Sequence, residues 1–170
     1  GGDIVNDVRA LQEAGSALVV ARHGSCGVCL MHMHRDPQSM QLAPMEGDAV
    51  PVVRTFLAQA AARLQVLGVG RTRSGLDPGI GFGKGVQRNR ALTADLRVLV
   101  ERGYPVLYGA SRKRMIQTLD PTAVDPLDRL GGSLALALEA ARQGAAILRV
   151  HDVRQTVQAL SIHSALEGLG

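Results

Sequence analysis

The stretch LDPGIGFGK, residues 76–84, decides how the rest of this chain is interpreted. A short apolar segment over residues 74–77 ends in a carboxylate at Asp77, and Pro78 and three alternate glycines follow. Packing explains such a carboxylate poorly, because ionised side chains are almost never buried without a partner. The stretch therefore predicts a strand that delivers Asp77 to a functional edge, followed by a tight glycine turn.

Two nucleotide-binding templates fail on the same stretch. A P-loop needs four residues between its first glycine and its Gly-Lys pair, whereas Gly79 and Gly83 are separated by three. Gly85 also stands where a Ser or Thr should follow the lysine. The dinucleotide fingerprint fails because Lys84 takes the place of its third glycine. The glycines are therefore interpreted as a turn and not as a phosphate loop.

Outward from this stretch, short apolar segments alternate with helical patterns along a single domain, residues 1–170. The predicted strands are Ile4–Val8, Val28–Met33, Ser74–Asp77, Pro105–Gly109 and Ile147–Val150. The predicted helices are Ala10–His23, Asp48–Leu67, Ala91–Arg102, Ser111–Leu119, Leu127–Gln143 and Asp152–Leu166, with a polar loop through Arg35–Pro37. This alternation is typical of an α/β fold with a parallel sheet.

Five βα units fit either an open doubly wound sheet or a piece of a (β/α)8 barrel. An open sheet concentrates its site at one switch point, whereas a barrel gathers residues from many strand ends. Polar or charged groups sit at the carboxyl-terminal ends of all five predicted strands, which favours the barrel. These groups are Asn6, His32, Asp77, Lys113, and Arg149 with His151.

The composition narrows the class of protein. Hydrophobic residues make up 46% and aromatic residues 2% of the 170, so an aliphatic core is expected. No run of eighteen apolar residues and no signal peptide is visible, so neither a membrane span nor export is predicted. Two cysteines then suggest a reducing cytoplasm. The net charge of +4 is scattered and stacking aromatics are scarce, so nucleic-acid binding is not favoured.

Cysteines and histidines cluster near the second predicted strand. Cys26 and Cys29 form a C-x-x-C, and His23 and His32 flank it at zinc-like spacing. A single C-x-x-C is weak evidence for zinc, so buried thiols are the favoured interpretation. His32 and His34 could bind metal from one strand face, but no acidic partner motif accompanies them. Strand termination near a polar site is therefore preferred.

Two basic groups suggest an anionic ligand. Arg149 and His151 are two residues apart at a strand end, so both side chains point the same way and suit a phosphate. The alternative is a surface arginine, with His151 and Asp152 capping the last helix. Ser111-Arg112-Lys113 opens the predicted short helix, where basic residues oppose the helix dipole unless an anion sits among them. The alternative there is a solvated basic turn.

Taken together, these segments resemble the dihydropteroate synthases, members of the pterin-binding barrel family. The resemblance is carried, across essentially the whole chain, by IVNDV, CLMHM with DPQSMQLAP, LDPGIGFGK, LYGASRK, RLGGSLA and RVHDV. It implies a (β/α)8 barrel of which this chain covers the fourth to eighth units. The family's N-terminal third, with two mobile substrate loops, a diphosphate- and magnesium-binding asparagine and a pterin-binding aspartate, has no counterpart here. We therefore expect the 170-residue piece alone to be inactive.

The resemblance also implies a reaction and its small-molecule partners. Pyrophosphate leaves 6-hydroxymethyl-7,8-dihydropterin diphosphate, and 4-aminobenzoate captures the resulting pterin-methylene cation to give 7,8-dihydropteroate. Sulfonamides are expected to compete with the arylamine. Mg2+ is the expected cofactor, with no ligand in this chain. The protein is expected to be a cytoplasmic homodimer that forms through its later helices.

Residue roles follow from the same resemblance, position by position. The implied catalytic residues are Asp77, Lys113, Arg149 and His151. Pterin is expected to contact Asn6, Met31, Asp77, Phe82, Gly109 and Lys113. Arg149 and His151 are expected to hold the diphosphate, and Ser111, Arg112 and Phe82 the aminobenzoate. Lys84 and His34 receive no role.

Three rival functions remain. A pterin-binding methyltransferase domain should lack the SRK and RVHD anion groups, which counts against it. A non-catalytic partner subunit of the same fold stays open because of the missing third. A metal-dependent barrel hydrolase using the histidines ranks last.

Overall fold

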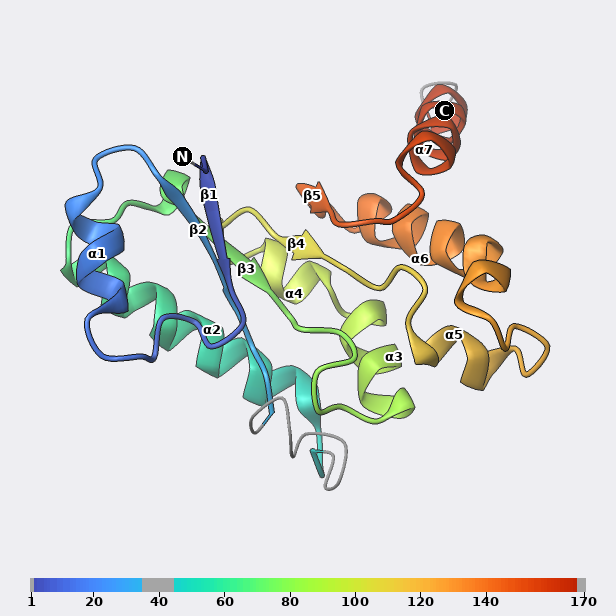
Figure 1. Cartoon of the computed structure of the whole chain (residues 1–170), viewed down its shortest axis with the longest axis horizontal. Coiled ribbons are helices and arrows are strands. Elements are labelled where there is room, and N and C mark those ends of the chain that lie inside the picture. The colour runs from blue at the N-terminus through green and yellow to red at the C-terminus, as the bar shows by residue number, and fades with distance from the viewer. Residues whose placement is uncertain (1, 35–44, 168–170) are drawn as a thin grey trace.

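Five parallel strands run side by side through the molecule. The computed structural model describes residues 2–34 and 45–167, so the predicted loop at Arg35–Pro37 lies outside the described residues. Strands β1 (Ile4–Asp7), β2 (Gly27–Met31) and β3 (Ser74–Asp77) form one sheet in that order, and β4 (Leu107–Tyr108) pairs with β5 (Ile147–Leu148). A parallel bridge between Leu76 and Val106 joins the two sheets (Figure 1).

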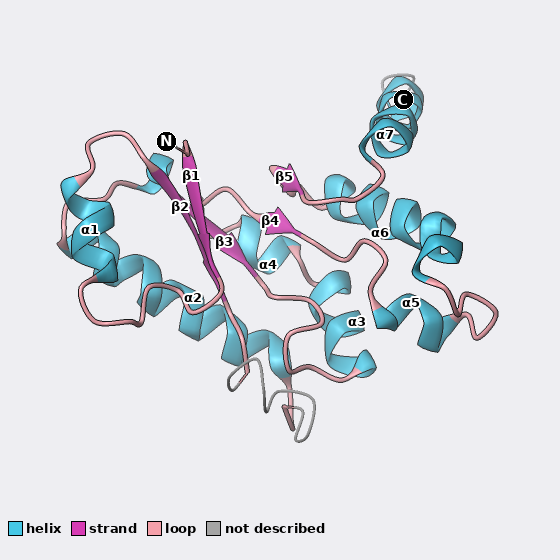
Figure 2. Cartoon of the chain, viewed as in Figure 1, coloured by secondary structure: helices cyan, strands magenta, loops and turns pink. Residues whose placement is uncertain are grey.

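Helices follow each strand and cover the outer side of the strands (Figure 2). The α-helices are α1 (Ser16–Arg22), α2 (Ala49–Val66), α3 (Val86–Ala94), α4 (Arg97–Val100), α5 (Arg114–Leu119), α6 (Leu130–Arg142) and α7 (Val153–Glu167). Two 3-10 turns, η1 (Arg71–Arg73) and η2 (Pro126–Arg129), precede β3 and α6. This order confirms the predicted alternation of strands and helices.

The core is aliphatic and centres on the middle strands. Leu30 and Leu76 are fully or almost fully buried and pack with the inner face of α2, where Val53 and Leu57 are fully buried. Each such side chain contributes about 1.5–3 kcal/mol relative to an exposed one. One polar pair sits among them, since the buried Tyr108 hydroxyl lies 2.8 Å from Thr93 Oγ1.

The register brings the site residues to one edge. Met31 lies opposite Asp77, and Asn6 lies opposite Cys29. Because all strands are parallel, their carboxyl ends meet at the same edge. Asp77 ends β3 at that edge, and His32 directly follows the end of β2.

The first and last strands border a common hollow. Within the described ranges β1 pairs with β2 alone and β5 with β4 alone. A hollow of about 750 Å³ lies between them, lined mostly by apolar residues of β1, β5, α6 and α7. Ile4 is 56% exposed there and Ile147 37%, so both edges carry uncovered apolar side chains.

Several predicted boundaries were wrong for local reasons. The first helix begins at Ser16 and not at Ala10, because Ala10 and Leu11 adopt positive φ angles of 51° and 55°. The Asp7 carboxylate accepts the Leu11 N–H there, and such side-chain bonds compete with helix formation. Gly15, with φ of 82°, then sets the helix start.

The helix predicted at Ala91–Arg102 is really two. Helix α3 begins at Val86, directly after Gly85, and ends at Ala94, and α4 follows as one turn. The predicted start at Leu127 is also wrong, because Asp125 caps a 3-10 turn before α6 begins at Leu130. Strand β2 ends at Met31, two residues earlier than predicted, because the Lys84 ammonium takes the His32 carbonyl.

Candidate active site

Asp77 is a buried carboxylate at the end of β3. It is 6% exposed, and its Oδ1 accepts the Gly79 N–H at 2.7 Å. Burial raises its pKa, while the Gly79 hydrogen bond and the nearby Lys113, Lys84 and Arg149 cations act in the opposite direction. Three cations around one carboxylate leave this strand edge positively charged, which suits an anionic ligand.

Lys84 holds the glycine turn against the neighbouring strand. Its buried Nζ donates to the carbonyls of His32 at 3.0 Å, Gly79 at 2.9 Å and Phe82 at 3.1 Å. Burial lowers its pKa to about 7, with Asp77 opposing that shift and Lys113 adding to it. Sequence reasoning assigns no role to Lys84. Its position at the end of the glycine run was the available signal.

The glycines of this turn are required by close contact as well as by backbone angle. A Cβ on Gly79 would lie 1.9 Å from the His32 carbonyl oxygen, and Gly79 has a φ of 67°. Gly83, with φ of 71°, would place a Cβ 2.3 Å from the His34 oxygen. The predicted tight turn is therefore confirmed, and its tightness comes from packing on the residues that follow β2.

Lys113 reaches from the β4–α5 connection to this turn. Its Nζ donates to the Ile80 carbonyl and lies 4.6 Å from the centre of the Phe82 ring. Burial lowers its pKa to about 8, with Asp77 raising it and Arg149 lowering it. Lys113 therefore lies close to both Phe82 and Asp77.

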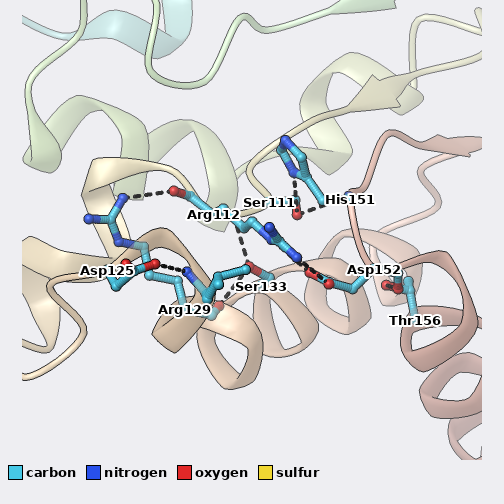
Figure 3. A network of polar contacts seen from close by, with 9 residues as sticks. Ser111, Arg112, Asp125, Arg129, Ser133, His151, Asp152 and Thr156 are labelled. Carbon is cyan, nitrogen blue, oxygen red and sulfur yellow. Dashed lines mark hydrogen bonds and ion pairs between the residues drawn. The ribbon is translucent and has the colours of Figure 1, made fainter.

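Ser111 joins the cluster to the end of β5. Its Oγ accepts the His151 N–H at 3.2 Å and lies 3.0 Å from His151 Nδ1 (Figure 3). The neighbouring Arg149 is exposed, and a Cβ on Gly109 would meet its Cβ at an ordinary 3.7 Å. The structure thus brings Ser111, Gly109, Arg149 and His151 together at adjacent strand ends.

The prediction that Ser111 and Arg112 open a helix is wrong. Helix α5 begins at Arg114, and Arg112 has a φ of 59°, which no helix accommodates. The Arg112 guanidinium binds the Asp152 carboxylate through two hydrogen bonds of 3.0 and 2.5 Å. Asp152 does directly precede α7, as expected of a cap, but its side chain turns to Arg112 (Figure 3).

Asn6 is the third residue of β1 and pairs with Cys29 of β2. It is exposed on β1 and lines the hollow that Arg149 also lines. Met31 is buried at the end of β2, opposite Asp77. In the register of the sheet, Asn6 is therefore two residues before the level of Met31 and Asp77.

The cysteines and histidines show no metal-binding geometry. Both thiols are free and buried, as predicted, and burial together with Asp77 raises the pKa of Cys29 to about 12. His32 is buried edge-on against Phe56, and burial lowers its pKa to about 3. Across residues 2–34 and 45–167, no three His, Cys, Asp or Glu side chains gather in a way that could hold a metal ion.

Comparison with known proteins identifies the family. The sequence model of the family described as pterin binding enzymes matches residues 1–151. The chain belongs to the pterin-binding enzyme family. It is 44% identical to dihydropteroate synthase of Escherichia coli K12 over 165 residues, which are 97% of this chain and 57% of that protein.

Solved structures of the family agree with this fold. The Yersinia pestis dihydropteroate synthase in a sulfonamide complex matches with a TM-score of 0.92 and 40% identity, over 99% of this chain and 60% of that one. The Xanthomonas albilineans dihydropteroate synthase in complex with 7,8-dihydropteroate matches with a TM-score of 0.89 and 41% identity, over 98% and 62%. The chain therefore has the fold of part of a pterin-binding TIM barrel and spans about 60% of these relatives.

No helix in the described part of this pterin-binding chain has the length and apolar character needed to cross a bilayer.

Proposed function

We propose that this chain is the carboxyl-terminal part of a dihydropteroate synthase, a transferase of folate biosynthesis. The observation that carries the proposal is the buried Asp77 with Lys113, Lys84 and Arg149 around it. A carboxylate suits the paired N–H donors of a pterin edge, and the surrounding cations suit a diphosphate. The Xanthomonas relative has been solved in complex with 7,8-dihydropteroate, which supports dihydropteroate as the product of the proposed reaction.

In the proposed reaction, the substrates are 6-hydroxymethyl-7,8-dihydropterin diphosphate and 4-aminobenzoate. The methylene C–O bond breaks and pyrophosphate leaves with the bonding electrons. The arylamine nitrogen then attacks the pterin-methylene cation and loses a proton to give 7,8-dihydropteroate. The protein acts by placing charges where the transition state develops them, because no covalent intermediate is involved.

We assign each end of the pterin substrate to a separate group. Asp77 accepts from the pterin edge and offsets positive charge on the ring, while Lys113 donates to its acceptor atoms. Met31, Phe82 and Gly109 form the walls, and Asn6 contacts the ring from β1. Arg149 and His151 bind the leaving diphosphate, which suits the exposure of Arg149 at the strand end.

The arylamine carboxylate is assigned to Ser111 and the arylamine ring to Phe82. A cavity of about 610 Å³ adjoins Phe82 and Lys113, and none of its lining residues in the described chain is acidic. An anionic group is therefore not repelled there. The sequence predicts Arg112 as a second contact for this carboxylate, but the Arg112 guanidinium already binds Asp152, so the carboxylate is assigned to Ser111 alone.

The cofactor, assembly and location belong to the same proposal. Mg2+ is expected of the family, but the described residues offer no ligand set for it, so no step is assigned to it here. Sulfonamides should compete with 4-aminobenzoate. We place the protein in the cytoplasm, because its two free thiols suit a reducing compartment. We also propose a homodimer that forms through the later helices.

The methyltransferase alternative finds less support. A ligand without a diphosphate has no need of Arg149, His151 and Ser111 at one edge, yet His151 is hydrogen-bonded to Ser111, and Ser111 and Arg149 line the same small cavity. Calorimetric titration with dihydropterin diphosphate tests the proposal. Binding that pyrophosphate competes away supports it, whereas the absence of heat at millimolar substrate points to a partner subunit of the same fold.

A further inference from the structure

Arg112 combines an unfavourable backbone with a position between two site residues. Its φ of 59° lies in the left-handed region, which residues with a Cβ rarely adopt. Such strain persists only where the surroundings hold it, and it concentrates at functional sites. Ser111 and Lys113, on either side, both reach groups at the carboxyl edge of the strands.

Three neighbouring segments hold Arg112 from different sides (Figure 3). Its N–H donates to Ser133 Oγ of α6 at 2.9 Å, and its carbonyl accepts from Arg129 Nη1 of η2 at 2.9 Å. Its guanidinium forms the bidentate pair with Asp152, at the start of α7. Backbone and side chain are therefore fixed together.

The supporting residues are themselves anchored. Arg129 is 6% exposed and also donates to the Ala123 and Val124 carbonyls and to Gln117 Oε1. Ser133 donates to the Arg129 carbonyl at 2.7 Å while it accepts from Arg112. The turn at Arg112 thus rests on a connected polar network and not on a single contact.

We propose that Arg112 and Asp152 are positioning residues of the site. Their ion pair holds the 111–113 turn in its left-handed form and ties it to the segment that carries His151. As a result, Ser111 meets His151 and Lys113 reaches the Phe82 turn. This inference rests on the proposed function for what the site binds. The contacts of Arg112 with Asp152 and of Ser111 with His151 do not depend on that function.

As a positioning residue, Arg112 holds the 111–113 turn and does not bind the ligand directly. A substrate carboxylate at the guanidinium would have to displace a bidentate carboxylate that is already in place. Removing Asp152 should therefore help a ligand-binding Arg112, because the guanidinium becomes available. Removing Asp152 should harm a positioning Arg112, because the turn loses its tie.

Amide hydrogen exchange on the ligand-free chain tests the positioning role directly. We expect Arg112→Ala and Asp152→Ala each to speed exchange at the N–H groups of Arg112 and His151 about tenfold. The double variant should add nothing further, and the amides of β2 should keep their wild-type rates. Arg114→Ala, which removes an exposed cation two residues away, is the matched control and should behave as wild type.

Unchanged exchange at both amides in Asp152→Ala would overturn the inference, and Asp152→Asn provides a milder variant if the alanine form unfolds. Arg112→Lys should not restore protection, because lysine lacks the planar fork that makes two bonds.

Titration with 4-aminobenzoate provides a second readout. The positioning role predicts about tenfold weaker binding in both Arg112→Ala and Asp152→Ala. Stronger binding in Asp152→Ala, with weaker binding in Arg112→Ala, would overturn it in favour of direct contact. If the wild-type chain binds no 4-aminobenzoate, the proposed arylamine site fails, while the exchange result still decides the role of Arg112.

Discussion

At the scale of single residues, the centre of the site is three ionisable groups largely removed from water, Asp77, Lys84 and Lys113. Burial favours the neutral form of each, so it raises the pKa of Asp77 and lowers that of Lys84 to about 7 and of Lys113 to about 8. For each group, oppositely charged neighbours act against this effect of burial, which makes the cluster sensitive to the loss of any member. A ligand that adds negative charge would stabilise both ammonium groups.

Lys84 gives this site a predictable dependence of stability on pH. Because its folded pKa lies below its usual 10.5, the unfolded chain binds more protons between about pH 7 and 10.5. The free energy of unfolding should therefore rise with pH in that window, and Lys84 should contribute about 1 kcal/mol per unit near pH 8–9. Urea unfolding at pH 7.5 and 9 should show a smaller rise in Lys84→Met. An equal rise in both proteins would contradict this role.

Lys84→Met should also destabilise the fold at any one pH. The change leaves three carbonyls without their donor, and we expect a loss of about 2–4 kcal/mol. The exposed Arg90→Met, on α3, is the control and should stay within about 0.5 kcal/mol of wild type. Denaturant midpoints measure both. A wild-type midpoint in Lys84→Met would show that the turn holds without its lysine.

At the scale of elements, the β3–α3 connection depends on its glycines. Gly79→Ala combines a positive φ with a Cβ 1.9 Å from the His32 oxygen, so we expect a loss of more than about 2 kcal/mol. Gly85→Ala is the matched control, because Gly85 has an ordinary extended backbone and open space for a Cβ. Thermal unfolding of the two variants should separate them. Equal melting temperatures would contradict the close packing of this turn.

The succession of strands along the chain and the polar residues at the strand ends could be predicted from the sequence, because both are local features of the chain. The strand at Ser74–Asp77 was predicted with its observed bounds. The start of α5 could not be predicted, because the left-handed turn at Arg112 is held by Ser133, Arg129 and Asp152, which lie 17 to 40 residues away. The same holds for Lys84, whose carbonyl partner His32 is 52 residues distant.

At the scale of the whole molecule, the strands form an arc of a barrel and not a closed one. Within the described residues, β1 and β5 each have a single strand partner and share an apolar hollow. The relatives are longer, since the chain spans 57% of the Escherichia coli protein. Groups needed for turnover are therefore expected outside these 170 residues.

We predict that the 170-residue chain, supplied with both substrates, shows little or no turnover, because it spans only 57% of the Escherichia coli relative. A steady-state assay of dihydropteroate formation measures this. Turnover close to that of a full-length relative would show that these five βα units suffice.

The assignment of the two ends of the pterin substrate to separate residues is the central claim, and one set of titrations tests it most directly. Wild type, Asp77→Asn and Arg149→Ala are each titrated calorimetrically with a phosphate-free pterin and with pyrophosphate. We predict that Asp77→Asn weakens pterin binding about 10- to 100-fold, the loss of a charged hydrogen bond, and leaves pyrophosphate nearly unaffected. Arg149→Ala should do the reverse. Unchanged pterin affinity in Asp77→Asn, together with a collapse of pyrophosphate affinity, would contradict the assignment.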